Sequence, residues 1–264
     1  MVRHIVAVYV DEIDLEEQIM GFGHWLNARR QILKFYKDIY QHYCKNRYFR
    51  KQQEQFDSRG DIPKVIHYAW FGKGEMPDVV KKCLATWPKF LTGYEVKLWD
   101  ESNFPIDEYP FARQAYEQKK YAFVADVVRL HAIYYYGGIY MDTDCEVLKN
   151  FDDLLYHNAF ACYESPNLIT IGTVGAKKHH PWIYDMLTWY QDVDFCDDYA
   201  EIASTRIYSK MARVQYGIKL QGQPQDLPNG VHLYTRDYFC PKKLDNAWGV
   251  TENTYVVHHF TGLW

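Results

Sequence analysis

The stretch FVADVVRLHAIYYYGGIYMDTD, residues 123–144, joins an apolar run of helical length to two carboxylates through a pair of glycines. Residues 121–136 are apolar on nearly all sides of a helical wheel, which predicts a buried helix. Gly137 and Gly138 allow the chain to turn sharply, and 138–142 then has the composition of a strand. This order predicts an α/β unit whose strand delivers acids at its carboxyl end.

The chain after residue 60 continues to alternate between strand and helix patterns. The predicted strands are 64–70, 94–100, 138–142, 145–149, 158–163, 168–175, 231–234 and 254–259, and the predicted helices are 78–87, 106–118, 121–136, 181–191 and 198–215. This alternation predicts an α/β fold with a mostly parallel central sheet flanked by helices. Sheets of this kind bind ligands at the carboxyl ends of their strands.

A change in composition near residue 60 predicts a domain boundary. Residues 24–59 have a helical pattern without Pro or Gly, and they contain nine Lys and Arg against three Asp and Glu. We therefore expect an N-terminal extension over 1–60, largely helical and basic, before a catalytic domain over 61–264. The basic helix is either a solvated arm packed on the domain or a peripheral contact with anionic lipid or a partner.

The composition of the 264 residues excludes several classes of protein. A formal net charge of -4 gives no reason to expect nucleic acid as a partner. No window holds 18 apolar residues, and the N-terminus lacks the pattern of a signal peptide. The six cysteines are scattered without a CxxC pair, so structural zinc is not expected. A cytoplasmic location is predicted, with possible peripheral contact at the inner membrane face through the basic helix.

The carboxylates at the end of the strand require an explanation. In extended chain Asp142 and Asp144 point to the same side, within about 7 Å of each other, and repel. A folded protein can solvate such a pair, neutralise it with Lys or Arg, or place a divalent cation between the two. Oxygen ligands suit Mg²⁺, Mn²⁺ or Ca²⁺. Glu146 follows as a neighbour of this pair.

The preceding helix contains a second unusual pair. Asp126 and Arg129 are neighbours, at i and i+3, in an otherwise apolar helix. They could form an internal ion pair. A buried ion pair brings little net stability, because desolvation offsets the attraction. A pair kept in such a helix is therefore also a candidate for binding a ligand.

Three stretches together resemble the glycosyltransferases with a DXD sugar-binding motif. They are IPKVIHYAWFG at 62–72, the opening stretch at 123–144, and YVVHHFTGLW at 255–264. The most similar group is family 32, the yeast-type initiating mannosyltransferases and their bacterial relatives in capsular polysaccharide synthesis. The glucosylating domains of large clostridial toxins are more distant. The spacing D-x-x-R-x(7)-G-G-x-Y-x-D-x-D is the most specific part, and the resemblance covers roughly 62–264 and does not extend to residues 1–60.

The resemblance implies a GT-A fold, which is a Rossmann-like α/β domain, and a set of site residues. It implies a metal, Mn²⁺ or Mg²⁺, that bridges the diphosphate of a nucleotide-sugar donor. The implied catalytic residues are Asp126, Arg129, Asp142 and Asp144. The implied metal ligands are Asp142, Asp144 and His259. The implied donor-binding residues are Trp70, Asp126, Arg129, Gly138, Tyr140, Asp142, Thr261 and Trp264.

Several of these assignments have alternatives. Trp70 would stack on the nucleotide base or else fill the core. Strand alternation turns only one of His258 and His259 inward, and we favour His259. In relatives a Ser often precedes the final Trp, whereas here Thr261 is the nearest hydroxyl.

The stretch ITIGTVGAKKHHPW at 169–182 reads as a strand, a glycine-rich turn and a helix. In it, Gly172 and Gly175 could admit a sugar or simply form a turn. His179 and His180 are expected at the surface.

The predicted activity is metal-dependent, retaining transfer of a hexose from a nucleotide sugar, UDP-hexose or GDP-mannose. The acceptor would be a glycan or a lipid-linked saccharide in surface polysaccharide synthesis. Retention without an evident protein nucleophile favours attack on the face from which the leaving group departs. Two alternatives remain, a toxin-like protein glycosyltransferase and a non-catalytic protein that binds nucleotide sugars.

Overall fold

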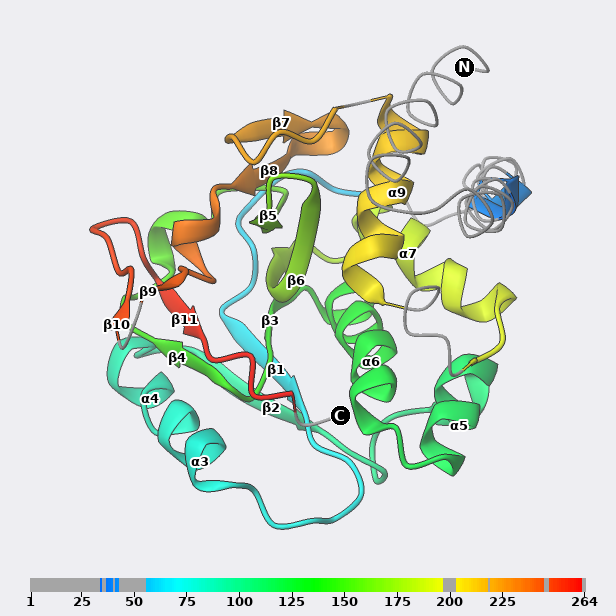
Figure 1. Ribbon diagram of the computed structural model, residues 1–264, viewed down its shortest axis with the longest axis horizontal. Helices are drawn as coiled ribbons and strands as arrows, with labels where there is room; N and C mark the ends of the chain where they lie inside the picture. Colours follow the sequence, from blue (N-terminus) through cyan, green and yellow to red (C-terminus); the bar gives the residue numbers. More distant parts are fainter. Residues whose placement is uncertain are drawn as a thin grey trace, which may run out of the picture.

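The computed structural model describes residues 34, 37–39, 41–42, 56–196, 203–217, 219–244 and 247–262. A seven-stranded sheet forms the centre of the molecule (Figure 1). Its strands are β1 (Val65–Ala69), β2 (Glu95–Trp99), β3 (Gly138–Met141), β5 (Ala159–Ser165), β6 (Leu168–Ala176), β7 (Gln225–Leu227) and β8 (Val231–Tyr234). Their order across the sheet is β2-β1-β3-β6-β5-β8-β7.

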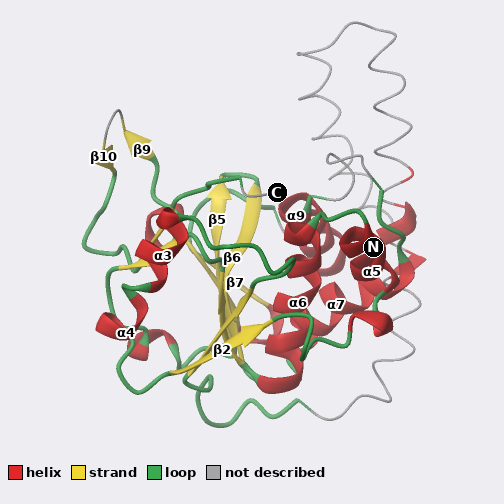
Figure 2. Ribbon diagram, turned by 90° about the horizontal axis from the view of Figure 1, so that it is seen from below, coloured by secondary structure: helices red, strands yellow, loops and turns green. Residues whose placement is uncertain are grey.

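Helices lie on both faces of this sheet (Figure 2). The described α-helices are α3 (Asp78–Leu84), α4 (Trp87–Phe90), α5 (Pro110–Glu117), α6 (Tyr121–Tyr136), α7 (Pro181–Asp192) and α9 (Ser204–Tyr216). Two short ribbons add to them, β4 (Cys145–Val147) with β11 (Val256–His258), and β9 (Lys243–Leu244) with β10 (Ala247–Trp248). The short 3-10 turns are η2 (Ile106–Glu108), η3 (Asp152–Leu154), η4 (Pro228–Gly230) and η5 (Arg236–Tyr238). The α/β class is the one that the sequence predicts, and the arrangement is consistent with the GT-A fold that the resemblance implies.

The parallel half of the sheet brings the ends of three strands to one edge. Strand β1 pairs in parallel with both β2 and β3. The residues that follow β1 and β3 are Trp70 and Asp142, so both lie at this edge. The predicted placement of the acidic residues at the carboxyl end of a buried strand is therefore confirmed.

The other half of the sheet departs from the prediction. Strand β6 runs antiparallel to β3 and β5, β7 runs antiparallel to β8, and β5 is parallel to β8. Three of the six pairings are therefore parallel, and the sheet is mixed instead of mostly parallel. The reason is local, because only Pro166 and Asn167 separate β5 from β6, and a link this short can join only antiparallel strands. The predicted strands near 145–149 and 254–259 form the separate β4–β11 ribbon.

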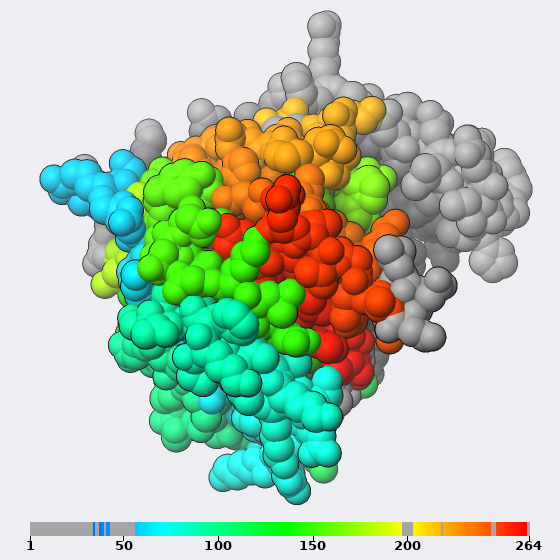
Figure 3. All heavy atoms as spheres, turned by 90° about the vertical axis from the view of Figure 1, so that its left-hand side faces the viewer, coloured from blue at the N-terminus to red at the C-terminus, as the bar shows by residue number. Residues whose placement is uncertain are grey.

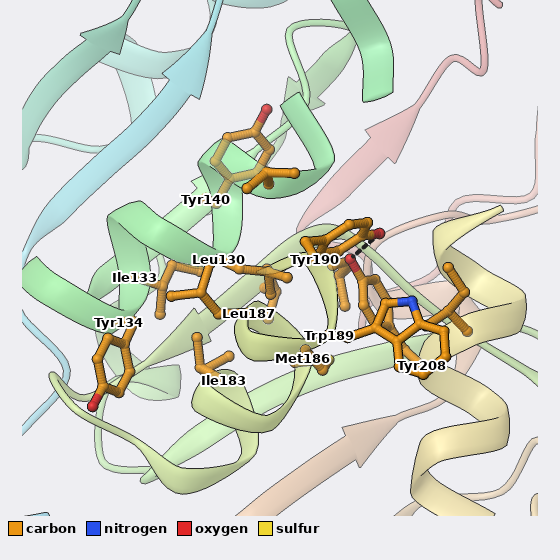
Figure 4. Close-up of a cluster of buried hydrophobic side chains, with 14 of the residues drawn as sticks. Leu130, Ile133, Tyr134, Tyr140, Ile183, Met186, Leu187, Trp189, Tyr190 and Tyr208 are labelled. Atoms are coloured by element: carbon orange, nitrogen blue, oxygen red, sulfur yellow. Dashed lines mark hydrogen bonds between the residues drawn. The ribbon is translucent and has the colours of Figure 1, made fainter. Parts of the chain in front are cut away.

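One face of the sheet is covered by α5, α6, α7 and α9, which enclose the larger apolar core (Figures 1 and 2). Side chains of α6 meet those of α7 and α9 in this core (Figure 4). Leu130 and Ile133 come from α6, and the hydroxyls of Tyr190 and Tyr208 are 2.9 Å apart in a hydrogen bond between α7 and α9. Because α6 is buried nearly all round, its polar residues are held inside the protein.

The opposite face carries a second apolar core beneath α3, α4 and the β4–β11 ribbon. Trp87 is fully buried there, and its indole N–H donates to the Cys145 carbonyl over 2.8 Å. Figure 3 shows this side of the molecule, where the cyan segment with α3 and α4 lies below the red C-terminal segment. The C-terminal segment is therefore fixed to the sheet beside the end of β3.

The predicted extension over 1–60 falls almost entirely outside the described residues. Ile39 is buried, and the His42 ring packs edge-on against Trp189 of α7 with 5.4 Å between the centroids. The boundary near residue 60 and the membrane contact of 24–59 stay predictions. Among the described helices, none combines the length and apolar character needed to cross a bilayer.

The turn between α6 and β3 fixes where the acidic residues go. Gly137 and Gly138 have φ angles of 69° and 107°, which side chains disfavour. A Cβ on Gly138 would lie 2.5 Å from the Val65 carbonyl oxygen. The fully buried His67 donates from Nε2 to the Gly137 carbonyl over 2.8 Å and accepts at Nδ1 from the Trp99 indole N–H over 3.2 Å. This ring is therefore neutral, because a proton on Nδ1 would face another donor.

His67 makes stability depend on pH in a definite direction. Burial lowers the pKa of His67 from 6.5 to about 4. Between these values the unfolded chain binds a proton that the folded protein does not, so stability falls as pH falls from about 6.5 towards 4. We expect His67→Gln, whose neutral amide can donate and accept in the same way, to lose less stability between about pH 8 and pH 5 than the unmodified protein. Urea unfolding of both proteins at the two pH values measures this.

The comparison at pH 8 is the internal control, since His67 is neutral there in both states. Any difference in stability between the two proteins at pH 8 therefore comes from packing and hydrogen bonding and not from protonation of His67. An equal loss of stability in the two proteins on acidification would contradict the assignment of a neutral His67.

Candidate functional site

A cavity of about 480 Å³ opens where β1 and β3 end. Its walls come from the loop after β1, from one side of α6, from the start of α9 and from the C-terminal segment. Asp126, Arg129, Asp142 and Asp144 all line it. The structure thus brings together the four residues that the sequence assigned to catalysis.

Asp142 and Asp144 lie in a turn and not in extended chain. The Cys145 N–H donates to the Asp142 carbonyl over 3.1 Å, which closes the turn, and the Asp142 N–H donates to the Gly172 carbonyl of β6 over 2.8 Å. Both carboxylates nevertheless approach the same ring. His258 Nε2 is 3.1 Å from Asp144 Oδ1 and 3.8 Å from Asp142 Oδ2. The predicted convergence therefore holds, although the backbone reason for it was wrong.

The histidine beside the two carboxylates is His258, which corrects the choice of His259. Antiparallel pairing of β11 with β4 sets His258 opposite Cys145 and turns its side chain inward. The next side chain points the other way, and His259 Nε2 lies 2.9 Å from Glu146 Oε2. Glu146 is accordingly a neighbour of the site and does not line the cavity. The register of this ribbon, which one sequence does not fix, decides between the two histidines.

The C-terminal segment also holds Asp144 directly. Thr261 donates from its backbone N–H over 2.9 Å and from its hydroxyl over 2.8 Å, both to Asp144 Oδ2. The Phe260 ring stacks on His258 with 4.1 Å between the centroids. Thr261 thus reaches the site through a carboxylate. Trp264, the other predicted donor contact of the tail, lies outside the described residues.

Arg129 neutralises two carboxylates at once. Its Nη2 is 3.1 Å from Asp126 Oδ1 and 3.0 Å from Asp142 Oδ1, and its Nη1 donates to the Ile171 carbonyl over 2.9 Å. Asp126 and Arg129 are both buried. The two alternatives for this pair are therefore not exclusive, since it is an internal ion pair that also lines the cavity.

Burial and neighbouring charges shift the pKa values of the three carboxyl groups of the site in different directions. Burial raises the pKa of Asp126 to about 6 against the opposing effect of Arg129, and burial also raises the pKa of Asp142. Burial acts on Asp144 in the same sense, but hydrogen bonds from His258 and Thr261 outweigh it, so the pKa of Asp144 lies below its usual range. The same carboxylates outweigh burial at His258 and raise its pKa. Asp144 therefore stays an anion.

The donor atoms fit a hard divalent cation. One oxygen of each carboxylate is fixed by protein, Asp142 Oδ1 by Arg129 and Asp144 Oδ2 by Thr261. The other oxygen of each faces His258 Nε2. Two carboxylate oxygens and an imidazole nitrogen suit Mn²⁺ or Mg²⁺, with His258 neutral when it binds the ion. The Cys145 thiol is also near, but burial and the neighbouring acids raise its pKa, so it remains protonated.

Two of the other predicted donor contacts line the cavity and one does not. Trp70 lines it, with its indole N–H donating to the Gly74 carbonyl over 2.8 Å, so it is a wall residue and not part of the core. Tyr140 lines it and packs its ring on the Arg129 guanidinium, 4.9 Å away. Gly138 is absent from the wall, because it packs against β1 at the far end of β3.

The two glycines of the stretch 169–182 also differ in whether they line the cavity. Gly172 lines the cavity, whereas Gly175 packs against the Phe160 ring in the core. Both lie within β6, so the predicted glycine-rich turn is continuous strand. His180, expected at the surface, is fully buried and accepts the Trp182 N–H at the start of α7.

Several cavity residues from separate parts of the chain have no role in the sequence prediction. They are Gly72, Tyr121, Glu164, Thr170, Ser204 and Thr205. Gly72, Tyr121 and Thr170 had a local signal, because each lies within a stretch that was already singled out. The other three are single polar residues in segments without a motif. Only the packing of β5, β6 and α9 around the end of β3 brings them to the cavity.

Comparison with known proteins identifies the central region. Residues 77–161 match the family described as "Glycosyltransferase sugar-binding region containing DXD motif". The chain is similar to inositol phosphoceramide mannosyltransferase 3 of Schizosaccharomyces pombe, with 31% identity over 171 residues that make up 62% of this chain and 44% of that protein. It is also similar to mannosyl phosphorylinositol ceramide synthase SUR1 of Saccharomyces cerevisiae, with 31% identity over 48% of this chain and 34% of that protein.

Other similar proteins are a virus protein and two solved structures. An uncharacterized glycosyltransferase, L373, of Acanthamoeba polyphaga mimivirus is 30% identical over 48% of this chain and 54% of its own length. The structure of PaToxG glycosyltransferase has a TM-score of 0.48 at 17% identity over 71% of this chain and 80% of that chain. A glycosyltransferase involved in glycosylation of the major capsid of PBCV-1 has a TM-score of 0.36 at 11% identity over 66% of this chain and 83% of that chain.

The resemblance to DXD glycosyltransferases is thereby confirmed, and the matched region contains all four predicted catalytic residues. The chain spans less than half the length of the two yeast relatives.

Two glycines of β6 allow a test that separates the site from the core. A Cβ on Gly172 would lie 2.8 Å from His258 Cε1 and 2.9 Å from Asp142 Oδ2, so Gly172→Ala displaces the donor atoms. We expect it to weaken Mn²⁺ binding about tenfold or more, as changes around metal ligands do. Isothermal titration with Mn²⁺ measures this.

Gly175→Ala is the matched control, three residues along the same strand. Its Cβ would lie 2.4 Å from Phe160 Cε1, so we expect about 1–3 kcal/mol of lost stability from overpacking with unchanged Mn²⁺ affinity. The same change in Mn²⁺ affinity in both variants would rule out a cation site beside Gly172.

Proposed function

We propose that this chain, which contains a glycosyltransferase sugar-binding region, is a metal-dependent retaining glycosyltransferase that moves a hexose from a nucleotide sugar to a hydroxyl of its acceptor. One observation carries the proposal. Each carboxylate of the D-x-D turn has one oxygen fixed by Arg129 or Thr261, while its other oxygen faces His258. Protein groups thus hold an oxygen of each carboxylate within 3.8 Å of one imidazole nitrogen at the end of β3.

Asp142, Asp144 and His258 would hold the cation. A divalent cation bound there would neutralise the charge that develops on the departing nucleoside diphosphate. Arg129 lies on the other side of Asp142 and supplies a second positive charge to the same wall. Its hydrogen bond to the Ile171 carbonyl fixes the guanidinium, so no reorganisation is needed during the reaction.

The donor would lie along the strand ends from β1 towards β6. Trp70 offers an indole face at one end of the cavity, where a nucleotide base would stack. Asp126 and Arg129 also line the cavity, beside Asp142, and they would hold the sugar and the phosphates in place for reaction. Absence of a side chain at Gly172 lets His258 and Asp142 approach β6 closely, which holds both side chains in place beside the D-x-D turn.

Retention would proceed by attack on the face that the leaving group vacates. Asp126, the acid on α6, is buried and paired with Arg129 and is therefore a poor nucleophile. The acceptor hydroxyl would then give its proton to the β-phosphate oxygen as the new glycosidic bond forms. A covalent sugar adduct on a carboxylate of this cavity, detected by mass spectrometry, would contradict this route.

Two classes of acceptor are proposed, and the comparisons support one of them. The yeast relatives are named for the mannosylation of inositol phosphoceramide, which supports a glycolipid acceptor. A lipid-linked saccharide in surface polysaccharide synthesis remains the other proposal, with the enzyme in the cytoplasm and the basic segment 24–59 resting on the inner membrane face. In both cases a lipid would hold the acceptor at a membrane while the reacting hydroxyl enters the cavity.

Removal of one carboxylate tests the cation site. We expect Asp142→Ala to lower Mn²⁺-dependent transfer about a hundredfold or more, because several kcal/mol of charge stabilisation are lost. The fold should persist, since Arg129 retains Asp126 as a partner. Radiolabelled transfer from a panel of nucleotide sugars, with and without chelator, measures this loss.

Glu146→Gln is the control, because this acid follows the turn but contacts His259 outside the cavity. We expect its transfer rate to match that of the unmodified protein. Near-normal turnover by Asp142→Ala would refute the cation assignment. Binding of nucleotide sugar without any hydrolysis or transfer would instead favour the non-catalytic alternative.

The donor can be identified through stability. A ligand that binds only the folded state raises the unfolding temperature, so we expect one of the UDP- or GDP-sugars to raise it only when Mn²⁺ is present. Thermal unfolding with each nucleotide sugar, with Mn²⁺ or with chelator, gives the result. An equal rise with chelator would show that the diphosphate binds without a cation.

A further inference from the structure

The cavity extends past the site for the donor to a polar end that the proposed function does not use. Glu164 of β5 lines this end, together with Thr205 at the start of α9, whereas the neighbouring Ser204 hydrogen-bonds to Asp126. In the order of the sheet, β1, β3, β6 and β5 are successive neighbours. With strands about 4.8 Å apart, β5 lies about 10 Å beyond β3 and farther still from the Trp70 end.

Glu164 is placed by a β-bulge. Tyr163 pairs with Ile169 and Ser165 pairs with Leu168, so Glu164 is the extra residue on β5. Such bulges redirect a side chain and are frequent near active sites. The bulge is fixed from behind, because Arg236 donates from Nη1 to the Glu164 carbonyl over 2.5 Å and from Nε to the Cys240 carbonyl over 2.8 Å.

The Glu164 carboxylate itself has no partner within the described part of the chain. Although Arg236 is adjacent, its hydrogen bonds go to the two backbone carbonyls and not to this carboxylate. The other carboxylates in the cavity, Asp126, Asp142 and Asp144, all have cationic or hydroxyl partners. Glu164 thus faces the cavity with carboxyl oxygens whose acceptor capacity is unfilled.

The geometry points to an acceptor site at this end, where Glu164 and Thr205 orient a neutral group rich in hydroxyls, such as a polyol or sugar ring. This inference rests on the proposed function, because it takes the donor to occupy the cavity from Trp70 to Gly172. The transferred sugar then lies over β6, between the D-x-D turn and Glu164. A hydroxyl held by Glu164 would approach that sugar from the side away from the nucleotide.

The chemistry of these residues selects the acceptor class. A carboxylate accepts hydrogen bonds from hydroxyls, and hydrogen bonds to a charged group are stronger than those between neutral groups. Phosphate carries only acceptors and a negative charge when ionised, so Glu164 repels it. Any phosphate of a glycolipid acceptor must therefore lie away from Glu164, with the hydroxyl face of its headgroup turned inward. Glu164 is a positioning residue in this arrangement and forms no bond to the sugar.

The test compares water with a neutral polyol as the acceptor in one reaction. Donor hydrolysis and transfer to myo-inositol, methyl α-mannoside and glycerol are measured together with Mn²⁺ and the donor found by thermal unfolding. We expect Glu164→Gln to raise the KM for the preferred polyol about tenfold or more, the loss for one charged hydrogen bond. Hydrolysis, which needs no oriented polyol, should keep its rate. Thr205→Val should show the same split to a smaller degree.

Glu146→Gln again provides the matched control, since it makes the same substitution at a glutamate that does not line the cavity. Equal loss of hydrolysis and transfer in Glu164→Gln would overturn the inference, because it would place Glu164 on the donor. Hydrolysis without transfer to any of the three polyols in the unmodified protein would also overturn it. Absence of Mn²⁺-dependent hydrolysis altogether would refute the proposed function itself, which distinguishes the two failures.

Discussion

Arg129 is buried between two carboxylates, and the site depends on this charge balance. One nitrogen of its guanidinium contacts both Asp126 and Asp142, and another contacts a backbone carbonyl of β6. Since an unpaired buried charge costs several kcal/mol, each partner is held by the others. The guanidinium thereby joins α6, the end of β3 and β6 at one point, which fixes the position of the D-x-D turn.

The carboxylates of the site outnumber its positively charged groups, which favours the binding of a cation. Three carboxylates, Asp126, Asp142 and Asp144, share this region with Arg129 and His258. Even with His258 protonated the group carries one net negative charge, and with His258 neutral it carries two. Low-dielectric walls strengthen the field of these charges. Arg129 and His258 neutralise part of the negative charge, which allows these carboxylates to be buried in the folded protein. The remaining negative charge attracts a divalent cation, and the bound cation can in turn hold a diphosphate.

The parts of the site that could be predicted from the sequence are those whose residues lie close together along the chain. Asp126 and Arg129 are one helical turn apart, and Gly137 and Gly138 adjoin the strand that leads to Asp142, so local spacing was sufficient for them. His259 was chosen wrongly over His258, because the pairing of β11 with β4 decides which of the two side chains turns inward, and a shift of one residue reverses it. Gly138 was included wrongly among the donor contacts, because its packing against the distant strand β1 places it at the far end of β3.

Glu164 illustrates the limit more clearly. It lies in the run AFACYES, which predicts an ordinary buried strand, and no motif marks it. Its direction follows from a bulge against β6, and the bulge in turn is fixed by Arg236, 72 residues later in the chain. The mixed character of the sheet has a related origin, since the hairpin of β5 and β6 follows from a two-residue link and not from periodicity.

The dependence of the site on the last strand has a consequence for folding. Asp144 receives hydrogen bonds from Thr261, 117 residues away, and it reaches His258 only because β11 pairs with β4. Contacts of such long separation form late, after most of their entropic cost has been met by other packing. Binding of a cation to Asp142, Asp144 and His258 would therefore stabilise the docked C-terminal segment as well as the ligand. The same linkage requires that segment to be docked before the cation is held by all three ligands.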